Sequence, residues 1–163
     1  MLVLVSLVSC KDDPEISKTP EINFGEFLLY KNISGKDSMI VLRINYEDGD
    51  GDLGLSSTDT LPPYNYGNSA FYNLFVTYQV NNGIKWEKIL NPSTSDTIHY
   101  NQRFPRLNLT KKDKHITGFM DLKIPASPYP GIKPSGVRFG IVMMDRALHK
   151  SNAVSSGDIF LKQ

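Results

Sequence analysis

The sequence predicts an all-β fold, a single antiparallel immunoglobulin-like β-sandwich of seven or eight strands. Apolar residues recur at every second position in several runs, which is the period of a strand with one buried face. Turn residues (Pro, Gly and Asn) separate these runs, and no run is a convincing helix. Tyr and Phe are abundant, with 8 of each, as is typical of strands. At 163 residues the chain suits one domain with a sizeable core, preceded by a tail.

The strand pattern occurs in runs that follow one another along the chain. They span 22–30, 39–46, 71–80, 84–90, 115–124, 137–145 and 151–161. In the second run, which is the cleanest, one face is expected to hold Ile40, Leu42, Ile44 and Tyr46. Asn81-Asn82-Gly83 predicts a hairpin between the third and fourth runs. The turn-rich stretch 91–101 is assigned to no strand.

The N-terminal segment points to a lipid anchor. The one cysteine, Cys10, excludes an intrachain disulfide and a cysteine-based zinc site. Residues 2–8 are nearly all apolar and lead into Leu7-Val8-Ser9-Cys10, which resembles the lipobox of bacterial lipoproteins. The resemblance implies that residues 1–9 are the end of a signal peptide and that Cys10 is acylated. The run is too short to span a bilayer, and a basic start is missing, so the true start is expected upstream. The alternative is a buried apolar strand with an incidental cysteine.

The residues after Cys10 suggest where the anchored protein goes. Lys11, Asp12 and Asp13 resemble the surface-export signal of lipoproteins from the Bacteroidota. That resemblance implies the outer face of the outer membrane, with the membrane contacted only through the lipid. Residues 10–21 are expected to be a disordered lipidated tether, and 22–163 the sandwich domain. An ordinary polar tether would have the same composition.

The stretch Asp48-Gly49-Asp50-Gly51-Asp52 predicts a calcium (Ca2+) site. Carboxylates so close repel one another unless water or a hard cation screens them, and the glycines let the backbone turn tightly. The helix–loop–helix calcium hand does not fit, because its required glycine is Leu53 here and the flanks read as strands.

A calcium site between two loops of a sandwich fits the sequence better. If the runs ending at Tyr46 and Asp145 are strands B and F, the loops after them meet at one end of the fold. Asp145 would then join Asp48, Asp50 and Asp52, with Asn152 and a backbone carbonyl completing the oxygen shell. The alternative is a solvated acidic turn.

The run from 137 to 152 resembles the last hairpin of bacterial immunoglobulin- and fibronectin-like domains. In those domains the strand commonly ends in Asp, Arg or Ala and Gly-Asn, whereas Leu148-His149 stands in the Gly-Asn position here. Together with the acidic loop, residues 22–161 resemble a group of uncharacterised Bacteroidota surface lipoproteins with such a domain. The resemblance implies the fold and the location but no particular activity.

Two classes of function follow. The first is a non-enzymatic, lipid-anchored surface module that binds a glycan or a protein or stiffens an assembly; the second is a small hydrolase. Tyr64, Tyr66 and Trp86 could stack on sugar rings, as in a carbohydrate-binding accessory protein of a glycan-uptake system. The alternative is that these rings pack a loop onto the sandwich. No nucleophile elbow or phosphate loop is present, so we expect no enzyme. The balance of 18 basic and 17 acidic residues gives no indication of nucleic acid.

Overall fold

The computed structural model describes residues 16–81, 83–107, 115–127 and 134–162, which form two antiparallel sheets and contain no helix. One sheet has the order β1-β2-β5, with β1 at Glu21–Lys31, β2 at Asp37–Asp48 and β5 at Ile116–Pro125. The other has the order β4-β3-β6-β7, and β8 also pairs with β6. Its strands are β3 (Leu74–Asn81), β4 (Trp86–Lys88), β6 (Gly136–Met143), β7 (Val154–Ser155) and β8 (Ile159–Phe160). The predicted all-β sandwich is confirmed.

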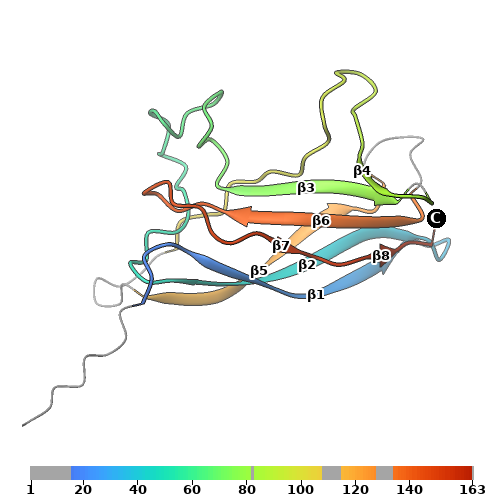
Figure 1. The fold of residues 1–163 in the computed structure, drawn as a ribbon, viewed down its shortest axis with the longest axis horizontal. Helices are drawn as coiled ribbons and strands as arrows, with labels where there is room; N and C mark the ends of the chain where they lie inside the picture. Colours follow the sequence, from blue (N-terminus) through green and yellow to red (C-terminus); the bar gives the residue numbers. More distant parts are fainter. Residues whose placement is uncertain (1–15, 82, 108–114, 128–133, 163) are drawn as a thin grey trace, which may run out of the picture.

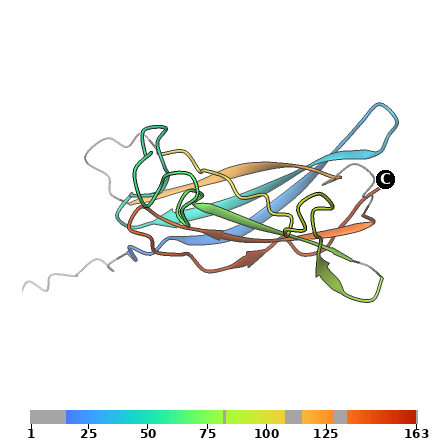
Figure 2. The same cartoon turned by 90° about the horizontal axis from the view of Figure 1, so that it is seen from above.

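The core lies between the two sheets, which face each other (Figures 1 and 2). Alternate residues of the central strands are buried, as the two-residue period predicts. On β6 these residues are Val137, Phe139, Ile141 and Met143, and on β2 they are Ile40, Leu42, Ile44 and Tyr46. Each large apolar side chain buried in this way stabilises the fold by roughly 1.5–3 kcal/mol.

The unassigned stretch 91–101 has a defined place beside β3. The backbone N–H groups of Tyr100 and Gln102 donate to the carbonyls of Val76 and Leu74, each at 2.9 Å. The buried side chain of Asn73 fixes the end of this segment, accepting from the Phe104 N–H at 2.6 Å and donating to its carbonyl at 3.3 Å. Strand β3 therefore begins at Leu74 rather than at the expected residue 71.

The start of β1, the loops after β2 and β6, and the long connection before β3 lie at one end of the sandwich, whereas β4 lies at the other (Figure 1). The last residues of the expected tether belong to the domain, because Ser17 accepts a backbone hydrogen bond from Gly49 at 2.9 Å and β1 begins at Glu21. Cys10, Lys11, Asp12 and Asp13 lie outside the described residues. None of the residues that the structure describes belongs to a helix able to cross a membrane.

Candidate metal centre and the neighbouring pocket

Three aspartates from two loops meet at this end of the sandwich. Asp48 is the last residue of β2, and Asp145 follows β6 by two positions. Carboxylate oxygens of Asp48, Asp52 and Asp145 lie within 4.8 Å of one another. Asp48 is 0% exposed and Asp145 is 1% exposed. The predicted meeting of the two loops is therefore confirmed, and the group could hold a metal ion.

The chain between Asp48 and Asp52 turns back on itself at Gly51, whose φ of 71° is left-handed. The Asp52 N–H donates to Oδ2 of Asp48 at 3.0 Å, which closes this turn. Leu53 and Leu55 are buried immediately afterwards and anchor the loop to the core. The turn therefore points the Asp48 carboxylate into the fold and leaves Asp52 half-buried beside it.

The loop after β6 is held by Asp145 itself. Its Oδ1 accepts the His149 N–H at 2.8 Å, and its Oδ2 lies 2.9 Å from Nδ1 of His149. Leu148 takes a left-handed φ of 71° in this turn, a conformation that glycine adopts more readily. The Ala147 N–H donates to Oδ2 of Asp52 at 3.1 Å, so the two loops are also tied directly.

The carboxylates have fewer hydrogen-bond donors than they need. Among the described residues, nothing donates to the buried Oδ1 atoms of Asp48, Asp50 and Asp52. Burial, followed by the charges of Asp50 and Asp52, raises the pKa of Asp48 to about 6. Burial and the charges of Asp145 and Asp50 also raise the pKa of Asp52. Acceptor oxygens thus face one another in a site where proximity and burial disfavour negative charge.

Asp50 and Asn152, the other two expected ligands, do not belong to the group of three aspartates. Asp50 borders the group, since its charge acts on Asp48 and Asp52. The structure gives Asn152 a role other than the expected ligand. Its Oδ1 accepts the Ile22 N–H at 2.8 Å and its Nδ2 donates to the Ile22 carbonyl at 2.7 Å, so its amide ties the segment before β7 to β1.

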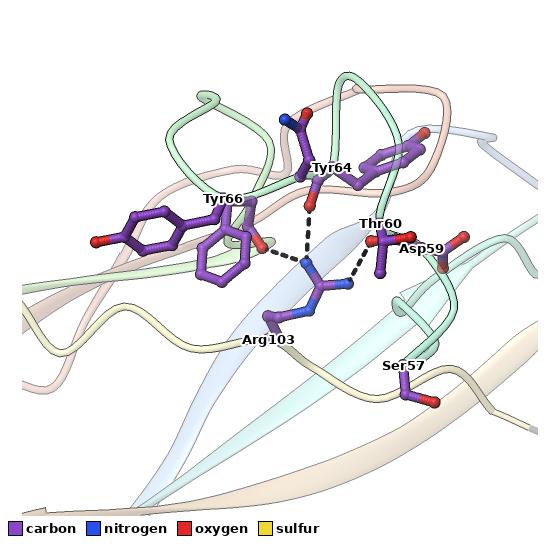
Figure 3. Close-up of a pocket in the computed structure, with 8 residues that line it drawn as sticks. Ser57, Asp59, Thr60, Tyr64, Tyr66 and Arg103 are labelled. Carbon is purple, nitrogen blue, oxygen red and sulfur yellow. Dashed lines mark hydrogen bonds between the residues drawn. The ribbon is translucent and has the colours of Figure 1, made fainter.

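A pocket of about 380 Å³ opens in the long connection before β3 (Figure 3). Its lining consists of Ser57, Asp59, Thr60, Tyr64, Asn65, Tyr66, Phe71 and Arg103. Two of the three expected glycan-contacting aromatics, Tyr64 and Tyr66, therefore share one site. Trp86 does not, because it pairs with Asn81 at the far end of β3, where the Arg138 guanidinium lies 4.3 Å from its ring centroid.

Arg103 organises the pocket, a role that no sequence pattern indicated. Its guanidinium donates to four backbone carbonyls of the connection, at 2.8–3.2 Å (Figure 3 draws three of these bonds). The acceptors are Ser56, Asp59, Tyr64 and Phe71. These bonds satisfy backbone carbonyls of a segment that has no regular strand or helix pairing. One side chain thus fixes the path of the connection.

Arg146 links the pocket to the group of aspartates. It directly follows Asp145, and its guanidinium forms a short ion pair with Asp59 while its carbonyl accepts the Tyr64 hydroxyl. The guanidinium also lies 5.5 Å from the centroid of the Tyr64 ring. The hydrogen bond from Arg146 lowers the pKa of Asp59 to about 2, so this carboxylate is ionised at neutral pH.

Comparison of the chain with protein-family models, with curated proteins and with solved structures gave no match. The molecule is therefore described by its fold and its candidate site alone. It is an all-β sandwich with a buried group of aspartates that could hold a metal ion, joined by Arg146 to an aromatic pocket.

Proposed function

We propose that the chain is a calcium-stabilised, non-enzymatic binding or structural module, held on the outer face of the outer membrane through a lipid on Cys10. One observation carries the calcium part. Asp48 is completely buried, and its Oδ1 has no donor within the described residues while facing the carboxylates of Asp52 and Asp145. A buried anionic oxygen without a donor is costly unless a cation neutralises it.

The donor set favours calcium over other common ions. Carboxylate oxygens are hard ligands, whereas zinc prefers nitrogen and sulfur. Magnesium requires a nearly octahedral arrangement, but calcium accepts six to eight oxygens in irregular geometry. A group assembled from two separate loops suits the more tolerant ion.

A solvated acidic turn accounts less well for this arrangement. In such a turn the carboxylates would point outward and be hydrated, whereas Asp48 lies inside the fold. Its pKa of about 6 expresses the cost of that burial. A cation would remove the same cost without moving the side chain.

A hydrolase is the weaker alternative. Asp59 is the one carboxylate lining the pocket, and with a pKa of about 2 it holds no proton to donate at neutral pH. Two carboxylates with separated pKa values, as in glycoside hydrolysis, are not found among the lining residues. These features support a module that binds rather than cleaves.

Asp52→Asn tests the calcium proposal, because the difference in melting temperature between variant and parent should have opposite signs without and with calcium. Without metal, the substitution removes one of several buried like charges and keeps an acceptor for Ala147, so the variant is expected to melt at a higher temperature than the parent. With calcium, the parent gains about 2.7 kcal/mol when the free ion is a hundredfold above its dissociation constant, and the variant gains much less. Thermal melts in EDTA and in calcium measure both effects.

Asp121→Asn is the matched control, since Asp121 forms an exposed pair with Arg43 and lies outside the site. It should respond to calcium as the parent does. Calorimetry without heat of binding at millimolar calcium, together with equal melting temperatures in EDTA and calcium, would overturn the proposal.

A further inference from the structure

The pocket beside the metal centre is a second site, with a chemistry of its own. We infer that it binds one neutral sugar unit, and that a metal ion at Asp48, Asp52 and Asp145 keeps it in its binding shape through Arg146. The effect of the metal ion rests on the proposed calcium function, whereas sugar binding by the pocket does not.

An exposed aromatic ring on a fixed loop is the first reason. Tyr66 is 84% exposed, although its ring packs edge-on against Phe71 at 5.2 Å between centroids. Phe71 is in turn held beneath the Arg103 guanidinium, 5.1 Å from the ring centroid. Such a ring offers a flat apolar face and loses little conformational entropy when a ligand stacks on it. The C–H face of a pyranose is a surface of that kind.

The charged groups of the pocket are already engaged, which disfavours an ionic ligand. Arg103 uses four of the five N–H groups of a guanidinium on backbone carbonyls, so little of it is left to hold an anion. Asp59 is ionised, but Arg146 already neutralises it. A ligand that supplied its own charge would therefore be desolvated and would find few hydrogen-bonding groups left to pair with it. The pocket is suited to a neutral molecule.

The remaining polar groups suit hydroxyls. Ser57 and Thr60 are exposed hydroxyl side chains, and Asn65 adds an amide. These groups can both donate and accept, as sugar hydroxyls do. At about 380 Å³ the pocket lies near the lower end of small-molecule sites, which fits a single sugar ring rather than a folded partner.

Arg146 provides the coupling to the metal. Asp145 contributes to the metal group, and the next residue holds Asp59 through its guanidinium and Tyr64 through its carbonyl. Both of those residues line the pocket. When no cation is bound, repulsion between Asp145 and the other two aspartates acts on the loop that positions Arg146. Calcium would relieve that repulsion, so we expect it to tighten sugar binding.

The test is an array of neutral and acidic oligosaccharides, probed with the full chain in calcium and in EDTA. We expect neutral saccharides to bind and Tyr66→Ala to weaken that binding about tenfold. Trp86→Ala is the matched control, because it removes a half-buried aromatic at the opposite end of β3 and should change nothing. Arg146→Gln should keep calcium binding, measured by calorimetry, and lose the effect of calcium on saccharide binding. Melting curves confirm that each variant folds.

The outcomes separate the two proposals. A protein that binds calcium but no saccharide at millimolar concentration overturns the pocket inference alone. If the protein binds saccharides through Tyr66 but does not bind calcium, sugar binding by the pocket is supported and its control by a metal ion is overturned. Binding of acidic saccharides only, or equal losses in Tyr66→Ala and Trp86→Ala, overturns the assignment of the pocket.

Discussion

Gly49 is required for a reason that its sequence context conceals. Between two aspartates it looks like a turn residue, and Gly51 does adopt a left-handed φ. A Cβ on Gly49, however, would lie 2.4 Å from the Ser17 carbonyl oxygen and 2.6 Å from that of Ile16. The glycine is thus needed because the N-terminal segment packs directly against the acidic loop.

Gly49→Ala is therefore expected to destabilise the fold by about 1–3 kcal/mol, because backbone atoms rather than a flexible side chain block the added methyl group. Denaturant unfolding of the purified chain measures the loss. Gly136→Ala is the control, since its Cβ would meet its nearest neighbours at an ordinary 3.6 Å. Equal stability of the two variants would contradict the packing described for Ser17.

The sequence predicted the group of aspartates that could hold a metal ion only as far as strand order allowed. Asp48, Asp52 and Asp145 could be foreseen, because a period-two pattern identifies the strands and strands B and F end at the same side of a sandwich. Asn152 could not be placed, because its bonds to Ile22 depend on how the segment before β7 lies against β1. Arg103 left no pattern at all, since its four acceptors are backbone carbonyls of an irregular segment.

Among the elements, the regular strands were predictable and the irregular connections were not. β2, β5 and β6 follow the alternation of apolar residues closely. The stretch 91–101 lacks that alternation, and its position along β3 is set by backbone bonds and by Asn73. Trp86 was grouped with Tyr64 and Tyr66 as a possible glycan contact, although it pairs with Asn81 at the other end of β3; sequence alone does not show at which end of a sheet a ring will lie.

The contact between the loop after β6 and the connection before β3 depends on pH through Asp59. Its pKa is about 2 in the fold against an ordinary value of 3.8, so the folded state binds this proton less tightly than the unfolded chain. The stability from this contact is then complete above about pH 4 and is lost as the pH falls towards 2.

Asp59→Asn should therefore cost about 2 kcal/mol at pH 6 and progressively less below pH 4, as the parent loses the same charge. Urea unfolding of parent and variant across this range measures the difference. Asp158→Asn, which breaks an exposed pair with Arg138, should cost less than about 1 kcal/mol. A cost for Asp59→Asn that stays constant down to pH 2 would exclude the ion pair as its source.

For the whole molecule, the proposed lipid anchor predicts that the protein leaves the membrane fraction when Cys10 is replaced. When the chain is expressed with a complete signal peptide, Cys10→Ala should move it from the membrane fraction to the soluble fraction, because acylation supplies the anchor. Replacing Lys11, Asp12 and Asp13 with alanine should leave the chain in the membrane but protect it from protease added to intact cells. Fractionation and protease treatment of whole cells measure the two effects, and unchanged behaviour of both variants would refute the anchor and the export signal.

The hydrogen bond between Ser17 and Gly49 also limits how far the acidic loop can lie from the bilayer. With a lipid on Cys10, six residues lie between the anchored cysteine and Ser17, and the seven steps from Cys10 to Ser17 reach about 25 Å even when fully extended. The aspartate group and the aromatic pocket would then lie at the end of the sandwich nearest to the lipid, and β4 would lie at the other end (Figure 1). A long soluble polymer would have to come down to the lipid surface to reach Tyr66, whereas a glycan attached to the same membrane already lies at that level.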